Sequence, residues 1–263
     1  MRGWLIYDRA GAERNAWFIA YLVRLSKEYS IPLEVKILED IEEEFRDLPD
    51  FAIVRSISPN LNERLENLGV RTVNNAVTSR IAGDKYETYL RGKEWNIPVL
   101  KTWLYDRENL PAEGEFPLVC KTTDGHGGQE VLWIESKEQC PRFKDGRKRI
   151  LQTPSKVLGK DMRAYVLGGE IVGCVLRESE RDFRSNFSLG GKVKPVAPTA
   201  EQREIVKILY EKLRFDYVGV DFLPNGDDWV LNEIEDAAGA RMLYECTDKD
   251  IARLFIEYLK ETL

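Results

Sequence analysis

The sequence contains a single histidine, His126, and four widely separated cysteines. One histidine excludes a metal centre built from several imidazole ligands, and a His-dependent catalytic triad would have to use this residue. Because no Cys-x-x-Cys spacing occurs, the cysteines indicate neither a disulfide framework nor a zinc site. We expect Cys120 and Cys174 to be small core residues in strands. Any catalysis would therefore depend on carboxylates, lysines, arginines and backbone groups.

Long apolar runs and a basic excess are also missing. No run approaches the roughly 20 apolar residues of a membrane-spanning helix, and the opening MRGWLIYDRAG lacks the apolar centre of a signal peptide. We therefore expect a cytoplasmic protein with no membrane partner. The formal net charge of −6 argues against a nucleic-acid partner. A length of 263 residues with 43% hydrophobic content is enough for two or three lobes, and the oligomeric state is left open.

Residues 1–76 alternate between strand and helix patterns, which predicts a small parallel α/β lobe. In its longest helix one side carries apolar residues at the spacing of a buried stripe, namely Trp17, Tyr21, Leu22 and Leu25. The predicted fold class is thus α/β, with α+β lobes following this one.

Two further lobes are predicted. Residues 77–153 indicate a helical piece, a short strand, and then a strand, a glycine-rich loop and a strand. Residues 154–263 indicate a hairpin turned at Gly168 and Gly169, a polar loop, a helix capped by Thr199, a second hairpin and a terminal helix.

The second hairpin carries three acidic residues that we expect on one face. Side chains alternate between the faces of a strand, and the turn PNGDD has an odd length, so we pair Leu223 with Trp229. That pairing places three carboxylates together: Asp221, Glu233 and Glu235. Carboxylates about 5 Å apart repel by roughly 3 kcal/mol at an effective dielectric near 20, so such a cluster binds protons or a cation such as Mg²⁺. The alternative is a solvated polar face on an edge hairpin.

The segment KTTDGHGGQ is a glycine-rich loop that Lys121 enters from a buried strand. Its backbone N–H groups at Gly125, Gly127 and Gly128 could cover a polyphosphate with little steric obstruction. It lacks Gly-Lys-Ser/Thr and precedes a strand, which excludes a Walker loop and a Rossmann fingerprint. A long hairpin turn is the alternative. Lys85 is a second candidate phosphate contact, or a solvated helical lysine.

The first hairpin carries two arginines. With a turn at residues 168 and 169, residue 163 pairs with residue 174, so Arg163 and Arg177 point to opposite faces unless a bulge intervenes. Only one of them would then contact a given ligand directly. Asp161 shares the face of Arg163. The polar loop that follows supplies a cation and two hydrogen-bonding groups, or is an ordinary exposed loop: Arg184, Ser185 and Asn186.

In this order the segments resemble the ATP-grasp superfamily, and within it the branch of ribosomal-protein glutamate ligases and lysine-biosynthesis carrier-protein ligases. The resemblance covers roughly residues 78–239, and the first 75 residues fit the small lobe that precedes an ATP-grasp core. It implies two sheet-containing lobes that clamp ATP. The segments that carry it are DKYETYL, PLVCK with GHGGQEV, LQT, GKDMRAYVLGGEIVGCVLR, DFRSNFSLGG, VGVDFL and LNEIEDAAG.

The resemblance implies roles for individual residues. Lys85 and Lys121 would contact the nucleotide phosphates, while Asp221 and Glu233 would bind Mg²⁺, with Mn²⁺ as an alternative ion. Gln152 and Thr153 would line the adenine slot. Asp161 would lie near the ribose, and Arg163 would also contact the nucleotide. Arg184, Ser185 and Asn186 would lie near the phosphates and the metal.

Three positions depart from the family pattern. Glu235 stands where family members usually have asparagine, which adds negative charge to the metal site and either favours a second Mg²⁺ or weakens the fit of the phosphates. Ala238 replaces a proline before the motif glycine. Gln152 is followed by Thr153 and Pro154, where an acidic residue is usual.

We therefore expect an ADP-forming ligase. A substrate carboxylate would attack the γ-phosphate of ATP, and an amine or similar nucleophile, of an amino acid or a peptide, would take the acyl phosphate. Mg²⁺, Lys121 and either Arg177 or Arg184 would neutralise the developing charge. The alternatives are an ATP-grasp kinase with a hydroxyl acceptor and a non-catalytic ATP-binding regulator, for which Glu235 is the hint. Arg241 would bind a substrate carboxylate or form a surface salt bridge.

Overall fold

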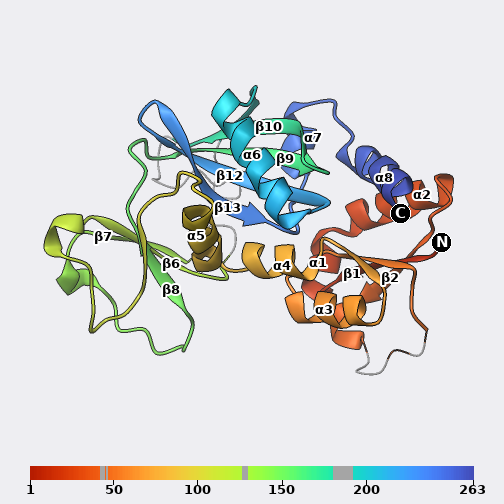
Figure 1. Cartoon of the computed structure of the whole chain (residues 1–263), viewed down its shortest axis with the longest axis horizontal. Helices are drawn as coiled ribbons and strands as arrows, with labels where there is room; N and C mark the ends of the chain where they lie inside the picture. The colour runs from red at the N-terminus through yellow and green to blue at the C-terminus, as the bar shows by residue number, and fades with distance from the viewer. Residues whose placement is uncertain (42–44, 46, 126–129, 180–191) are drawn as a thin grey trace.

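The computed structural model describes residues 1–263 except 42–44, 46, 126–129 and 180–191. Within these residues the strands form three sheets, which we number in chain order. The third sheet lies between the first and the second along the longest axis of the molecule (Figure 1). The expected α/β architecture with separate sheet-containing lobes is confirmed.

The first sheet is parallel throughout, as the alternating strand and helix patterns predict. Its strand order is β2-β1-β3-β4, and β1 and β3 are buried along their whole length, as inner strands of a parallel sheet are. The elements are β1 (Gly3–Tyr7), α1 (Arg9–Arg14), α2 (Ala16–Glu28), β2 (Leu33–Ile37), a 3₁₀ turn (Leu38–Asp40), β3 (Phe51–Val54), α3 (Pro59–Asn67) and β4 (Arg71–Val73).

Helix α2 buries Leu22 and Leu25 in the core of this lobe, as its apolar stripe predicts. The same stripe predicts a buried Trp17, and this is wrong, because the Trp17 side chain is 66% exposed. Trp17 lies in the first turn of α2, and its ring contacts the ring of Tyr244 near the other end of the chain. The first turn of α2 therefore lies outside the core of the first lobe.

The second sheet is antiparallel, with strand order β5-β8-β6-β7. The helical piece expected before it is two helices, because the carboxylate of Asp84 caps a new helix by accepting a hydrogen bond from the Tyr86 N–H (2.8 Å). Lys85 is the first residue of that helix. The elements are α4 (Ala76–Ala82), α5 (Lys85–Glu94), β5 (Thr102–Leu104), β6 (Leu118–Thr122), β7 (Val131–Ile134), β8 (Arg149–Gln152) and 3₁₀ turns at Glu113–Glu115 and Lys137–Gln139.

The third sheet has the order β11-β10-β9-β12-β13, with antiparallel neighbours. Thr199 caps the expected helix through a full capping box with Gln202. Strand β11 was expected to be part of a polar loop, and α7 has no counterpart in the sequence prediction. The elements are β9 (Lys160–Leu167), β10 (Glu170–Glu178), β11 (Lys192–Pro195), α6 (Ala200–Leu213), β12 (Tyr217–Asn225), β13 (Asp228–Glu235), α7 (Arg241–Cys246) and α8 (Ile251–Thr262).

The two faces of the third sheet differ in what covers them. One face packs Val218, Val220 and Phe222 against α6 and is apolar along its length. The other is apolar at one end, where Tyr165 and Tyr217 pack with α8 and the first lobe in a shared core. Its remaining part carries charged side chains, and it is this part that forms the candidate site.

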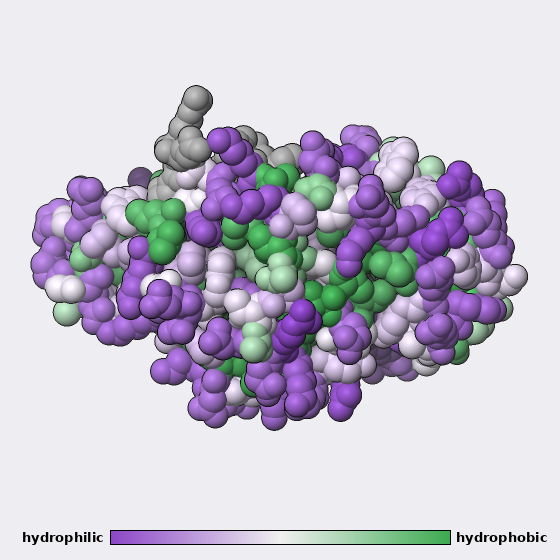
Figure 2. Space-filling model, turned by 90° about the horizontal axis from the view of Figure 1, so that it is seen from above, coloured by the Kyte–Doolittle hydropathy of each residue, from purple (hydrophilic) through white to green (hydrophobic). Residues whose placement is uncertain are grey.

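Each of the predicted intervals 1–76, 77–153 and 154–263 contains one sheet, and their boundaries stay a prediction. Helix α8 nevertheless packs against α2, so the end of the chain adjoins its beginning (Figure 1). Cys120 and Cys174 are buried and free, as expected. Among the described helices, none is long and apolar enough to cross a membrane. In the view of Figure 2, hydrophilic side chains cover both ends and hydrophobic ones gather in the middle.

Candidate active site

Six charged residues form a row across four strands of the third sheet, which we call the charged row. Antiparallel partners that lie directly opposite each other share a face. The register pairs Arg177 with Asp161, Arg163 with Asp221, Asp221 with Glu233, and Gly219 with Glu235. The charged row therefore consists of Asp161, Arg163, Arg177, Asp221, Glu233 and Glu235.

Arg177 belongs to this row because of a bulge. The turn is at Gly168 and Gly169, as predicted, and both have positive φ (55° and 87°), which glycine adopts without strain. The register then shifts between Ile171 and Gly173, so that Arg163 pairs with residue 175 and not with residue 174. The sequence predicts that Arg163 and Arg177 point to opposite faces unless a bulge intervenes. A bulge does intervene, so the two arginines share a face.

A second bulge lies in the hairpin formed by β12 and β13, which we call the acidic hairpin. The predicted pairing of Leu223 with Trp229 is wrong, because the turn is shorter and Leu223 pairs with Val230. The register shifts between Asp221 and Phe222, which leaves Asn232 as the extra residue. Beyond the shift the parity is restored, so Asp221 and both glutamates share a face as expected.

The row is tied together by ion pairs between buried groups. Arg163 binds Asp221 through two hydrogen bonds, from Nε to Oδ1 (2.7 Å) and from Nη2 to Oδ2 (2.8 Å), and it also donates to Glu235. Arg177 donates from Nη2 to Oδ2 of Asp161 (2.8 Å) and to Oδ2 of Asp221 (2.7 Å). Because Asp221 is only 1% exposed, both arginines are needed to compensate its buried charge.

Two lysines face the row from outside the third sheet. Nζ of Lys85, at the start of α5, lies 3.0 Å from Oε2 of Glu233 and also donates to the carbonyl oxygen of Gly125. Nζ of Lys121, on β6, donates to Oδ1 of Asn232 (3.1 Å). The ammonium groups of both candidate phosphate-binding lysines therefore contact the acidic hairpin, and Gly125 of the glycine-rich loop lies beside Lys85.

The pKa values follow from these contacts. Burial lowers the pKa of Lys121 to about 8, although Glu233 opposes the shift. Burial would raise the pKa of Asp221, but Arg163 and Arg177 outweigh it and hold that pKa well below its ordinary value. For Glu235 burial prevails over Arg163, and its pKa is raised.

The other predicted residues lie apart from the row or outside the described residues. Gln152 is buried on β8, where its amide donates to Oγ1 of Thr102 (3.0 Å), and the N–H of Thr153 donates to the carbonyl oxygen of Lys101 (2.9 Å). Arg241 is exposed at the start of α7 and has no hydrogen bond or ion pair with the described residues. The candidates that lie outside the described residues are Gly127, Gly128, Arg184, Ser185 and Asn186.

Sequence reasoning missed Asn232 and Asn74. Asn232 was placed on the apolar face of β13, and a bulge brings its amide to Lys121. Buried Asn74 joins the first lobe to the third sheet, because its side chain donates to Oδ1 of Asp236 (2.6 Å) and accepts from the N–H of Tyr217 (2.8 Å). Asp236 was correctly predicted to leave the strand for a turn. Asn232 shares its predicted strand face with Val230 and Ile234, and this polar residue on an apolar face was the available signal, whereas Asn74 had none.

The donor chemistry of the site suits a hard cation, since Asp221 and Glu233 present carboxylate oxygens from directly opposite positions. Both carboxylates are paired with lysine or arginine in this arrangement. Within the described part of the chain, no three His, Cys, Asp or Glu side chains are arranged to hold a metal ion. An ion would therefore compete with the ammonium of Lys85 for Glu233.

Three sheets in this order, with a charged row opposite Lys85 and Lys121, define a fold of the ATP-grasp class. Residues 106–259 match the family described as the RimK-like ATP-grasp domain, and the chain belongs to this family. The resemblance seen in the sequence and the expectation of an ADP-forming ATP-grasp ligase are thereby confirmed.

Relatives and solved structures agree with this class. The chain is 28% identical to the uncharacterized protein MG011 of Mycoplasma genitalium, over 96% of this chain and 90% of that protein. It is 26% identical to the glutamate–LysW ligase ArgX of Sulfurisphaera tokodaii, over 81% and 82% of the two chains. The fold is similar to that of the ATP-grasp ligase PsnB complexed with a variant of its minimal precursor, Mg and ADP, with a TM-score of 0.70 and 13% identity over 98% and 97% of the chains.

Proposed function

We propose that this ligase uses ATP and Mg²⁺ to activate a carboxylate of an amino acid or a peptide and joins it to an amine. The observation that carries the proposal is the placement of Lys85 and Lys121 opposite the charged row of the third sheet. A polyphosphate between them would meet two ammonium groups on one side and two arginines on the other. Relatives that ligate glutamate support an amino-acid or peptide substrate.

Positioning and charge neutralisation would supply most of the rate enhancement. A carboxylate oxygen attacks the γ-phosphorus while the bond to the β-phosphate oxygen breaks, and ADP leaves. The amine then attacks the carbonyl carbon, inorganic phosphate leaves, and the nitrogen loses a proton. Lys121 would hold phosphate oxygens through this sequence, and Arg177 would stabilise the charge that develops on the transferred group.

Asp221 and Glu233 would hold Mg²⁺, and Lys85 would move from Glu233 to the nucleotide phosphates. The bound ion would supply positive charge to the phosphate oxygens. Arg163 would keep Asp221 ionised and would hold both Asp221 and Glu235 in place. We also propose that Gly125, Gly127 and Gly128 cover the phosphates and that Arg184, Ser185 and Asn186 approach them from the polar loop.

The remaining assignments complete the proposed site. Gln152 and Thr153 would line the adenine slot, and Asp161 would lie near the ribose. Arg241, which is exposed and has no described partner, would bind a substrate carboxylate. We propose a cytoplasmic location, because four free thiols suit a reducing compartment.

The test is a screen of amino acids, dipeptides and peptide tails for ADP release with ATP and MgCl₂. Hydroxylamine is added to trap the acyl phosphate, and the protein with Glu233→Gln is the control. We expect a hydroxamate that forms only with ATP, the correct acid and the unaltered protein. Phosphorylation of an alcohol without hydroxamate would instead support a kinase and overturn the proposal, as would ATP binding without ADP release for every acid.

A further inference from the structure

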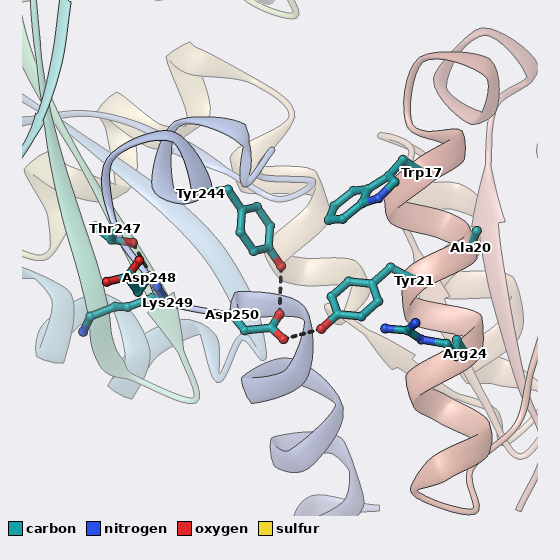
Figure 3. A pocket seen from close by; sticks show the side chains of 9 residues that line it. All are labelled: Trp17, Ala20, Tyr21, Arg24, Tyr244, Thr247, Asp248, Lys249 and Asp250. Carbon is teal, nitrogen blue, oxygen red and sulfur yellow. Dashed lines mark hydrogen bonds between the residues drawn. The ribbon is translucent and has the colours of Figure 1, made fainter.

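A pocket of about 600 Å³ lies between α2 and the segment that joins α7 to α8 (Figure 3). This size is in the range of sites that take a small molecule or a few residues of a peptide. None of its lining residues belongs to the charged row. The lining residues are Trp17, Ala20, Tyr21, Arg24, Tyr244, Thr247, Asp248, Lys249 and Asp250.

Three aromatic rings line the pocket, two from α2 and one from α7 (Figure 3). The ring of Trp17 lies 5.4 Å from that of Tyr21 and 5.8 Å from that of Tyr244, and the Trp17 and Tyr244 rings are nearly perpendicular (88°). Trp17 is the exposed residue of the stripe, Tyr21 is partly buried, and Leu22 and Leu25 are buried. In an edge-to-face pair one ring face is covered by the partner's edge and the outer faces are left for a ligand, and tryptophan is the strongest aromatic partner of a cation.

Negative charge lies next to these rings. The Asp250 carboxylate accepts hydrogen bonds from the hydroxyls of Tyr244 (3.0 Å) and Tyr21 and lies between the two rings (Figure 3). Burial opposes its ionisation, but these hydrogen bonds and that of the Arg253 N–H lower its pKa, so it stays charged at neutral pH. The Arg253 guanidinium lies at its outer edge, with Nε 3.6 Å from Oδ2, and compensates part of this charge. Asp248 adds an exposed carboxylate from the same segment.

The two basic residues of the lining are already engaged. The ammonium of Lys249 donates to the carbonyl oxygen of Val172 (2.5 Å) and points away from the rings (Figure 3). The guanidinium of Arg24 lies 4.9 Å from the ring centre of Tyr21, with its Nε 3.8 Å from Glu28. Arg24 thus already places a cation against one of these rings, while the faces of Trp17 and Tyr244 have no described cation over them.

We propose that this pocket binds the basic side chain of a lysine or arginine residue in a peptide segment. The ammonium or guanidinium lies against Trp17 and Tyr244, and Asp248 and Asp250 supply the opposite charge. The mainly apolar rings contact the methylene stem of the same side chain. The formal net charge of −6 attracts a basic segment over a longer range. This inference does not depend on the ligase reaction.

The test is calorimetric titration of the full chain with the peptide Ac-Gly-Gly-Lys-Gly-Gly-NH₂, without nucleotide. The same peptide with Nε-acetyl-lysine, and one with glutamate, serve as matched probes. We expect the lysine peptide to bind at least about tenfold more tightly than either, and its affinity to fall with added salt. Equal binding of the acetylated peptide, or no binding of the lysine peptide, would overturn the proposal.

Variants separate the pocket from the rest of the surface. Trp17→Ala should weaken lysine-peptide binding about tenfold, and Asp248→Asn about threefold, because each removes one of the two attractions. Leu68→Ala, an exposed apolar residue elsewhere on the first lobe, should leave binding unchanged. Arg24→Gln should tighten binding by removing a competing cation. Weaker binding by the Arg24 variant would show that the pocket selects anions and would refute the proposal, whether or not the Trp17 variant folds.

Discussion

The hairpins β9–β10 and β12–β13 are built alike and contribute differently to the site. Each has a two-residue turn and one register shift among the described pairs. In the first hairpin the bulge at Val172 lies near the turn and changes the face of everything beyond it, including Arg177. In the second the bulge lies beside Asp221 itself and delivers the Asn232 amide to Lys121. The bulge far from the site thus determines which face of the sheet Arg177 occupies, whereas the bulge within the site adds the contact between Asn232 and Lys121.

The hairpins also carry opposite charges. The first contributes Arg163 and Arg177 with one acid, Asp161, and the second contributes Asp221, Glu233 and Glu235. Strand β9 pairs with β12, so the arginines meet the carboxylates of the second hairpin. Neither set could be buried alone, because an isolated ionised group in the interior loses several kcal/mol of hydration. The pairing of the two hairpins therefore stabilises both sets and positions them for a ligand.

The largest effect is expected from removing the carboxylate of the acidic hairpin that is paired with Lys85. Glu233→Gln should reduce kcat about a thousandfold through loss of a metal ligand and leave the melting temperature within a few degrees, since the side chain is 25% exposed. ADP release and thermal unfolding are the measurements. Asp228→Asn, on the same strand, is the matched control, and unchanged turnover in Glu233→Gln would remove the metal assignment.

Removing Asp221, the buried acid that both arginines bind, tests how the two hairpins stabilise each other. Asp221→Ala leaves Arg163 and Arg177 without their shared partner and should lower the free energy of unfolding by about 3–5 kcal/mol. Urea denaturation measures this loss. A variant as stable as the original would contradict the ion-pair network.

Lys121 gives the site a pH dependence. With a pKa of about 8 in the free protein, Lys121 is mostly neutral at pH 9, whereas bound phosphates would stabilise its charged form. ATP binding should therefore take up a proton above pH 8, and Kd should rise about tenfold between pH 7 and 9. Calorimetry in buffers of different ionisation enthalpy measures both. Lys121→Arg stays charged over this range and should bind ATP without the trend, so a trend that persists in it would point to another group.

The bulge of the acidic hairpin can be tested through its own side chain. Asn232→Ala removes the hydrogen bond to the ammonium of Lys121 and should raise KM for ATP about fivefold, the value of about 1 kcal/mol for one such bond. The value of kcat should change less, since Lys121 itself remains. Steady-state kinetics at pH 7 separates the two, and an unchanged KM would show that the bulge serves only the fold.

The smallest effect is expected where the sequence departs from the family. Glu235→Asn should change KM for ATP by no more than about threefold, because Arg163 already compensates the extra carboxylate. Measurement at several Mg²⁺ concentrations tests this. A tenfold gain in ATP affinity would mean that the charge of Glu235 reaches the nucleotide.

Local signals predicted most of the fold. Thr199 begins α6 with a capping box, Gly168 and Gly169 form the expected turn, and the parallel first lobe follows from its strand and helix patterns. Trp17 was placed wrongly because the helical period does not tell where a lobe ends. Strand β11 was missed because two of its four residues, KVKP, are lysines, one is proline, and the strand forms an edge.

The candidate site was predictable in its residues and less so in its geometry. The face shared by Asp221 and Glu233 follows from alternation, and it holds because both lie on the same side of the bulge. The contact between Asn74 and Asp236 spans 162 positions and has no local signature. Bulges and such distant partners depend on how the lobes pack, which the pattern of one strand does not contain.

The packing of α8 on α2 has a mechanical consequence. The start and the end of the chain share one core, so the first and third sheets are held as a single body. The second sheet has a core of its own, around Leu118 and Leu151. A hinge movement would therefore swing the second sheet against the rest, with Lys121 on the travelling side and Asn232 on the stationary side. Their hydrogen bond joins the two parts across that hinge, so it holds Lys121 beside the third sheet.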